Sequence, residues 1–296
     1  MIKYEWRTQL DSGEAAQLAD LLERAAAYDA EPEYTTIDFR DVERTLTDSR
    51  VRHLLIWMLP YATELGGREH PERIAGLLRL VVEPDGTAHG AIVIDPRLRS
   101  IGITTLLLEQ VGLDASGPDG WLGTGAHTII AWAQGNHPAA GRLGNRFLIP
   151  RTRRVWKLIR STGSAEEAAA APVLEPIGTD AIDESLGWVD TTAPDELYAL
   201  RESGRVAGVV AFDRRPVVSE LFGECAMITA KSAAPSAQPV ALRRLLDGAA
   251  ALAREAGRTG LVVYVDSDDA AWVTACRLSG FQHDRTDVCF QLGGRP

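Results

Sequence analysis

The chain has 296 residues, 45% of them apolar and 24% charged, a composition typical of one large or two ordinary globular domains. Its formal net charge of −10 and sequence pI of about 5.2 exclude the strongly basic class of nucleic-acid binders. No apolar run is long enough to span a membrane, and no His/Cys group has the spacing of metal ligands.

The cysteines, Cys225, Cys276 and Cys289, form no C-x-x-C pair, and the first residues lack the apolar stretch of an export signal. These features predict a cytoplasmic protein with free thiols and without metal, membrane or nucleic-acid partners. A basic cluster at 151–160 alternates with apolar residues, so we interpret it as a solvated strand or helix face. The oligomeric state is left open.

The first part of the chain carries patterns typical of short strands around two helices. A capping box, Asp11-Ser12-Gly13-Glu14, precedes a helix in which leucines recur at helical spacing. A turn at 83–86, Glu-Pro-Asp-Gly, joins two strands as a hairpin. The strands are predicted at 2–7, 53–58, 74–82 and 88–94, and a second helix at 38–47.

The segment 92–107 is the most informative of the chain. A β-type run ends at Pro96, a basic residue and a glycine follow at Arg99 and Gly102, and a helix-like apolar run begins. This order predicts a strand, a tight turn and a helix N-terminus, where the first N–H groups lack partners and the helix dipole favours negative charge. We therefore expect a site for a phosphate or pyrophosphate group.

The remaining segments suggest that the chain is duplicated. A small, acidic stretch at 161–172 lacks apolar periodicity and is typical of a linker. A hydrophobic strand, a polar turn and a helix occur at 128–146 and again at 260–276, a period of roughly 130 residues. The other predicted elements are the helices 104–111 and 240–256 and the strands 153–159, 173–177, 197–202, 205–212, 224–231 and 286–292.

The loop Arg99-Ser100-Ile101-Gly102-Ile103-Thr104 resembles the [RQ]-x-x-G-x-[GA] loop of the GNAT superfamily of acyl-CoA-dependent N-acetyltransferases, with Thr104 at the last small position. In that superfamily the loop N–H groups hold the pyrophosphate of CoA. A closer resemblance is to the mycothiol synthase (mycothiol acetyltransferase) family of tandem GNAT proteins. It is carried by residues 131–143, 222–225, 263–271 and 280–283.

The resemblance implies an α/β fold of the α+β type, made of two tandem GNAT domains. Each would be a mixed, mostly antiparallel sheet flanked by helices. We expect an N-terminal domain at 1–160 with an intact acyl-CoA loop, the linker at 161–172, and a C-terminal domain at 173–296. In the second domain the matching loop, 232–241, lacks both glycines and contains Pro235 and Pro239, which have no N–H. The interval 177–197 is also too short for the usual two helices.

Acetyl-CoA, or another acyl-CoA, is the expected cofactor, and its expected contacts follow the loop and the strands around it. Ile92 and Ile94 would offer strand backbone to the pantetheine arm while lying partly in the core. Asn136, between a strand and a helix, is either a helix N-cap or a pantetheine contact. The complete set is Ile92, Ile94, Arg99, Ser100, Ile101, Gly102, Ile103, Thr104, Thr105 and Asn136.

Two residues are expected to be catalytic because they match family positions. Glu224 occupies the place of the general base that deprotonates the amine, and is otherwise a solvent-facing strand residue. Cys276 replaces the Tyr general acid of the family, and is otherwise a half-buried helix residue. The expected activity is acyl transfer to a primary amine of a small polar metabolite. A non-catalytic protein that holds CoA as a structural or sensing ligand, and an authentic mycothiol synthase, are the alternatives.

Overall fold

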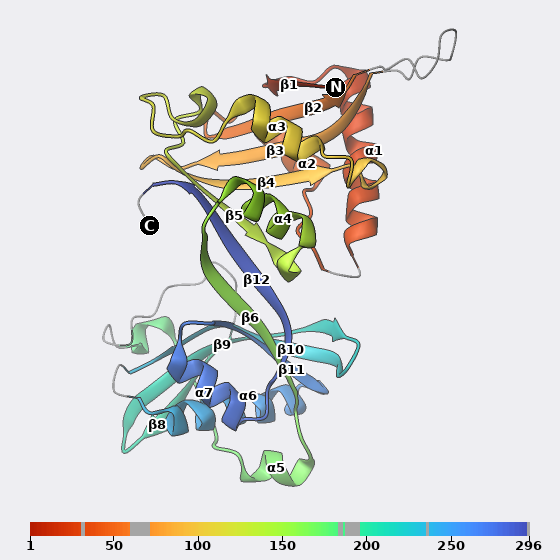
Figure 1. The fold of residues 1–296 in the computed structure, drawn as a ribbon. Coiled ribbons are helices and arrows are strands. Elements are labelled where there is room, and N and C mark those ends of the chain that lie inside the picture. The colour runs from red at the N-terminus through yellow and green to blue at the C-terminus, as the bar shows by residue number, and fades with distance from the viewer. Residues whose placement is uncertain (31–32, 60–71, 183–185, 187–195, 235–236, 295–296) are drawn as a thin grey trace. The chain divides into compact units, whose positions relative to one another are not determined.

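The computed structural model describes residues 1–30, 33–59, 72–182, 186, 196–234 and 237–294. The chain forms two compact units, which Figure 1 shows with their elements labelled. Unit 1 contains Met1–Arg153 together with Asp287–Pro296, and unit 2 contains Arg154–Thr286. These boundaries differ from those expected at 160 and 173, and the segment expected as a linker contains helix α5 (Ala165–Ala170) behind a capping box formed by Ser164 and Glu167.

Unit 1 is built on a six-stranded sheet in the order β1-β2-β3-β4-β5-β12. Neighbouring strands are antiparallel except for β4 and β5, which are parallel. The strands are β1 (Ile2–Arg7), β2 (Val51–Met58), β3 (Arg73–Val82), β4 (Thr87–Ile94), β5 (Thr128–Ala133) and β12 (Gln282–Gly293, in unit 1 from Asp287).

Helices cover both faces of this sheet. The helices are α1 (Ser12–Asp29), α2 (Phe39–Thr45), α3 (Ile103–Val111) and α4 (Pro138–Phe147). Leucines of α1 pack with Leu55, Leu77 and Val93, whereas α3 packs with Leu54 and Ile56. Because successive strand residues point to opposite faces, α1 and α3 lie on opposite sides of the sheet. The predicted capping box starts α1, with Asp11 and Glu14 each accepting from the other's backbone N–H.

Unit 2 repeats this plan. Its strands follow the order β6-β11-β10-β9-β8-β7, and only β10 and β11 are parallel. They are β6 (Arg151–Ser161, in unit 2 from Arg154), β7 (Glu175–Pro176), β8 (Glu196–Glu202), β9 (Arg205–Ser219), β10 (Gly223–Ala233) and β11 (Gly260–Asp266). The helices α6 (Pro239–Glu255) and α7 (Ala270–Leu278) pack on its main core. The predicted fold class, a mixed sheet with flanking helices in each half, is therefore confirmed.

The C-terminal part of the last strand, from Asp287, belongs to unit 1. Residues Val288 to Gly293 of β12 pair with β5, and Val288 and Phe290 are buried beside α4. A Cβ atom at Gly144 of α4 would lie 2.5 Å from the Phe290 ring, so this close packing requires glycine. All three cysteines are buried and free. Among the described helices, none has the length and apolar character needed to cross a membrane.

Candidate functional site

The parallel strands β4 and β5 separate halfway along β4. Their register runs from Thr87–Thr128 to Gly90–Ala131 and ends there. From Ala91 to Ile94, β4 keeps only its β3 partner, while Trp132 and Ala133 of β5 pair with β12. Ile92 is 39% exposed and Ile94 packs under α3. This half of β4 therefore offers a strand edge to which an extended amide chain can bind by β-augmentation.

The loop after β4 leads to an uncapped helix N-terminus. Ser100 and Gly102 both have left-handed backbone, with φ of 68° and 88°. Gly102 is the N-cap of α3 and supplies no side-chain cap. Within the described part of the chain, no group accepts a hydrogen bond from the N–H groups of residues 102–105. A Cβ at Gly102 would meet nothing within 4 Å, so an anion has room to approach these donors.

Buried side chains anchor this loop from beneath. Ile103 is 5% exposed and packs in the core under α3, whereas Ser100, Ile101 and Gly102 are exposed. Thr104 and Thr105 are half-buried in the first turn of the helix. The loop thus presents backbone donors outward while one apolar side chain fixes the helix start.

Arg99 points to α1 rather than to the open side of the loop. Its guanidinium makes two hydrogen bonds to the Asp29 carboxylate, at 2.6 and 2.7 Å, and its Nε donates to the Ile94 carbonyl at 3.1 Å. The same guanidinium lies 5.1 Å from the centre of the Tyr28 ring. The hydrogen bond from Arg99 to Asp29 raises the pKa of Arg99. The side chain therefore ties the loop to the end of α1.

A second ion pair ties the start of the loop to the same helix. Asp95 is 3% exposed, caps the 3-10 turn Pro96–Leu98 and accepts from Arg24 at 2.7 Å. Burial favours the protonated form of Asp95, but the hydrogen bonds from Arg24 and from the Arg97 N–H outweigh it and lower its pKa. Removing one partner of such a buried pair leaves an uncompensated charge, which costs about 3–5 kcal/mol.

Asn136 lies on the other side of the strand divergence. It is exposed, has a φ of 50° and ends the 3-10 turn Gln134–Asn136. The N-cap of α4 is His137, whose Nδ1 accepts from the Ala139 N–H at 3.1 Å. The His137 ring packs on Tyr34 with 4.3 Å between centroids, and burial together with Arg99 lowers the pKa of His137. The cap role considered for Asn136 therefore falls to its neighbour.

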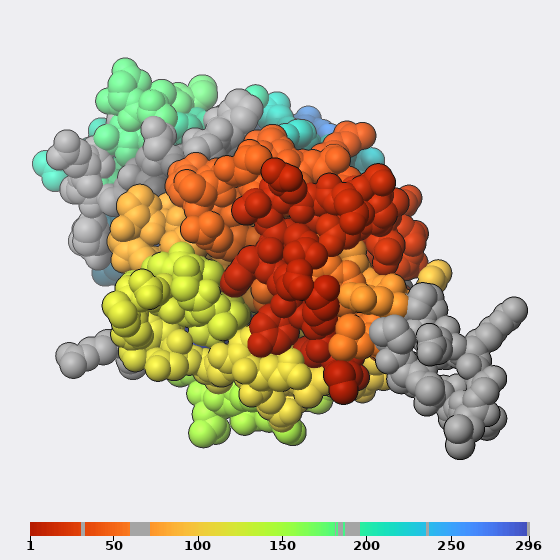
Figure 2. All heavy atoms as spheres, turned by 90° about the horizontal axis from the view of Figure 1, so that it is seen from above, coloured from red at the N-terminus to blue at the C-terminus, as the bar shows by residue number. Residues whose placement is uncertain are grey.

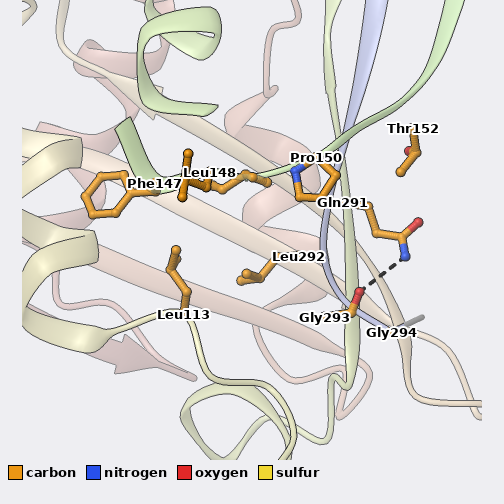
Figure 3. A pocket seen from close by; sticks show the side chains of 10 residues that line it. Leu113, Phe147, Leu148, Pro150, Thr152, Gln291, Leu292, Gly293 and Gly294 are labelled. Atoms are coloured by element: carbon orange, nitrogen blue, oxygen red, sulfur yellow. Dashed lines mark hydrogen bonds between the residues drawn. The ribbon is translucent and has the colours of Figure 1, made fainter. Parts of the chain in front are cut away.

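Two pockets in unit 1 flank α3. A pocket of about 290 Å³ adjoins the N-terminal turn of the helix and is lined by Met1, Ile101, Gly102 and Thr105 among others. Figure 2 shows the N-terminal strand in red beside the yellow surface of this region. The second, about 150 Å³, lies by the C-terminal ends of α3 and α4 among Leu113, Phe147 and Leu148 (Figure 3). Because helix C-termini repel anions, the first pocket is the better neighbour for a phosphate.

In unit 2 the parallel strands β10 and β11 separate in the same way as β4 and β5, but a lysine side chain lies between them. The register of β10 with β11 runs from Cys225–Gly260 to Ile228–Val263 and then ends. Beyond it, the Lys231 ammonium donates to the Tyr264 carbonyl at 2.7 Å and lies 5.3 Å from the centre of the Trp272 ring. Helix α6 begins at Pro239, which has no N–H. Pro235 and Ser236, and most of the interval 177–197, lie outside the described residues.

The structure places Glu224 at the surface of unit 2 and Cys276 in its core. Glu224 lies near the start of β10, and its side chain is 59% exposed. Its carboxylate oxygen is 2.5 Å from a guanidinium nitrogen of Arg258. Lys231, which marks the strand divergence of unit 2, lies about 23 Å further along the same strand. Cys276 is fully buried in the core of unit 2, where burial raises its thiol pKa to about 12. A buried thiol of this pKa is a poor proton donor, which argues against Cys276 as the acid.

Sequence reasoning missed Asp29, which anchors the loop after β4, and Lys231, which lies in the strand divergence of unit 2. Asp29 and Lys231 have no motif around them, and each acts through a partner distant in the chain. The sequence shows Asp29 only as a carboxylate at the end of a predicted helix, and this pattern does not indicate a functional residue. Across the described residues, no three His, Cys, Asp or Glu side chains are placed together to hold a metal ion.

The chain is similar over nearly its whole length to curated mycothiol acetyltransferases. It is 26% identical to that of Saccharomonospora viridis, over 99% of this chain and 100% of the relative, and 25% identical to that of Nocardia farcinica, over 99% of each. No family model matches the chain.

Solved tandem acetyltransferases share the fold. A GCN5-related N-acetyltransferase from Sphaerobacter thermophilus superimposes with a TM-score of 0.56 at 14% identity, over 99% of this chain and 96% of that one. A tandem GNAT protein from the clavulanic acid pathway gives 0.57 at 15% identity, over 100% and 99%. The chain therefore has the tandem GNAT fold, and its resemblance to the mycothiol acetyltransferases is confirmed.

Proposed function

We propose that the chain transfers the acyl group of acetyl-CoA, or of another acyl-CoA, to a primary amine of a small polar metabolite. Unit 1 holds the donor. One observation carries this proposal: the uncapped N-terminus of α3 at Gly102 directly follows the unpaired edge of β4. The tandem GNAT fold and the acetyltransferase names of the relatives support it.

Three parts of unit 1 would hold the donor. The N–H groups of residues 102–105 suit the pyrophosphate, since they are unpaired and lie at the positive end of a helix. The backbone of Ile92 and Ile94 suits the amides of the pantetheine arm, and Asn136 stands across the divergence from them. The bound donor supplies the thioester, and Arg99 with Asp29 keeps the loop in shape.

The proposal is tested by titrating acetyl-CoA into the protein and into a Gly102→Ala variant. We expect one donor per chain, because Lys231 occupies the matching place in unit 2. Alanine at φ 88° strains the loop, so we expect the affinity to fall at least tenfold. Gly204→Ala is the matched control, since Gly204 also has positive φ (78°) and open space around it, but lies in the β8–β9 turn. Equal affinities for the two variants would refute the loop assignment.

The amine is identified by the release of CoA thiol from acetyl-CoA in the presence of candidate acceptors. Whole-length similarity to mycothiol acetyltransferases makes the acceptor of those enzymes the first to test. Tight binding of acetyl-CoA without transfer to any amine would instead favour a protein that holds CoA as a structural or sensing ligand. Two observations favour that second candidate. Lys231 fills the strand divergence of unit 2, and Glu224 is held in an ion pair with Arg258.

A further inference from the structure

His89 stands at the point where β4 and β5 part. It pairs with Ile130, and the next pair, Gly90–Ala131, is the last one of the register. A Cβ at Gly90 would meet Leu80 and Ile129, each at 3.2 Å, both in the cluster beneath the end of α3. Side chains alternate along a strand, so the imidazole of His89 projects from the opposite face of the sheet. It is exposed and makes no hydrogen bond to any described residue.

The unpaired edge of β4 leads from the CoA loop to this histidine. Four residues separate Ile94 from Gly90, about 13 Å of strand. An acyl-pantetheine chain extended along this edge from the loop therefore brings its thioester toward the Gly90–Ala131 junction. The residue next to that junction on the opposite face is His89. An exposed imidazole at this place is well positioned to take a proton from an incoming amine.

Arg79 provides an unpartnered cation beside His89. It lies on β3 opposite Ala91, diagonally across from His89, and on the same face of the sheet. Its Nε is buried without a hydrogen-bond partner, and its guanidinium forms no ion pair with a described residue. The facing residue on β2, His53, is neutral at neutral pH, because burial and the charge of Arg79 lower its pKa to about 4. A half-buried cation of this kind can bind an anionic ligand.

The other residues on the His89 face of the sheet are also compatible with an anionic ligand. Strands β3, β4 and β5 contain no aspartate or glutamate. Trp132 lies two residues beyond Ile130 on the same face and is half-buried, with the Arg153 guanidinium 5.8 Å from its ring centre. Cationic and aromatic side chains thus lie near the point where β4 and β5 separate, while the carboxylate of Asp287 on β12 accepts a hydrogen bond from the Gly135 N–H.

We propose that this face of unit 1 is the acceptor site, with His89 as general base and Arg79 binding a carboxylate or phosphate of the acceptor amine. The inference rests on the proposed function. The imidazole takes a proton from the ammonium group of the acceptor, which frees the nitrogen lone pair to attack the thioester carbonyl carbon. The C–N bond forms and the C–S bond breaks, its electron pair leaves with sulfur, and the CoA thiolate takes up the proton that the nitrogen then loses.

The role of Arg79 is tested with three acceptors of similar size: β-alanine, O-phosphoethanolamine and ethanolamine. CoA thiol release should show kcat/KM at least tenfold higher for one of the anionic acceptors than for ethanolamine, and the better of the two identifies the anion. Arg79→Gln should remove this preference. Arg73→Gln, on the same strand, should keep it. A preference for ethanolamine, or one that survives in Arg79→Gln, would overturn the anion site.

The role of His89 is tested by His89→Gln. We expect kcat to fall by about 100-fold or more while the affinity for acetyl-CoA stays unchanged. The loss should shrink for hydroxylamine, which is already neutral at neutral pH and needs no base, once its uncatalysed rate is subtracted. His283→Gln, an exposed strand histidine of unit 2, should behave as the parent protein. An equal loss with every acceptor, or no loss, would refute the base.

The failures of the two proposals are distinguishable. Transfer that persists in His89→Gln and Arg79→Gln overturns this inference alone, and loss of transfer in Glu224→Gln instead moves the base to unit 2. Failure of the parent protein to bind acetyl-CoA, or to acylate any acceptor, overturns the proposed function and this inference together.

Discussion

Asp29 helps to hold the loop of the proposed donor site, although it lies 70 residues from the arginine it binds. Its carboxylate is almost fully buried and takes both hydrogen bonds from Arg99. The bidentate geometry fixes the guanidinium plane, and with it the Ile94 carbonyl that accepts from the same side chain. On the proposed function, the pair would act on phosphate binding indirectly, by keeping Ser100 and Gly102 in their left-handed conformation.

Asp29→Asn should therefore weaken acetyl-CoA binding at least tenfold, since it leaves the Arg99 charge poorly compensated and frees the loop. The effect should depend on the pyrophosphate. For S-acetyl-N-acetylcysteamine, a donor without phosphates, kcat/KM should change less than twofold. Asp213→Asn is the matched control, because Asp213 is also a well-buried carboxylate with bidentate bonds to an arginine, but in unit 2. Equal losses for both donors would indicate general unfolding of the site.

Local sequence patterns predicted most strands and helices, but they did not predict which elements distant in the chain contact one another. The Asp11–Glu14 box and the leucine spacing after it were sufficient to place α1, and alternation with a Pro-Asp-Gly turn placed β3 and β4. Helix α5 was missed because its alanines resemble a linker, although Ser164 and Glu167 formed a readable capping box. The Lys231–Tyr264 contact had no sequence signal, since it depends on which strands diverge.

The packing of α2 against β2 contains a buried histidine that makes the stability of unit 1 depend on pH. His53 is 1% exposed, and its Nε2 lies 3.1 Å from the Thr45 hydroxyl at the end of α2. Burial, helped by Arg79, lowers its pKa from 6.5 to about 4. Between these two pH values the unfolded chain binds the proton and the folded chain does not. The free energy of unfolding therefore falls as pH decreases from about 6.5 toward 4.

A shift of this size corresponds to about 3 kcal/mol over the whole range, and to about 2 kcal/mol between pH 7 and pH 5. Urea unfolding at these two pH values measures it. His53→Gln should be less stable at pH 7 and should lose most of the dependence, while His283→Gln should retain it. A parent protein whose stability is the same at pH 5 and pH 7 would contradict the neutral state assigned to His53.

At the scale of the whole molecule, the C-terminal segment 287–296 belongs to the same unit as the N-terminal half of the chain. A boundary drawn along the sequence assigns all of 173–296 to the second half, because the apolar pattern at 286–292 predicts a strand without naming its partner. The structure pairs Val288 to Gly293 with β5, the strand that borders the proposed donor site. Residues 1–153 contain the entire loop of the proposed donor site, and yet the sheet that they form is completed by a strand from the end of the chain.

This return predicts that a substitution near the C-terminus acts on the donor site. Phe290→Ala should cost about 3–5 kcal/mol of stability, by opening a cavity between β12 and α4 beside Gly144. It should also weaken acetyl-CoA binding, because β5 loses the packing that positions Trp132 and Ala133.

Phe281→Ala is a close control: that ring is 8% exposed against 7% for Phe290, and each lies under an arginine, but Phe281 packs in the core of unit 2. A similar loss of stability with unchanged acetyl-CoA affinity is expected for it. Calorimetric titration well below the unfolding transition separates the two effects, and equal affinities in both variants would mean that β12 does not support the donor site.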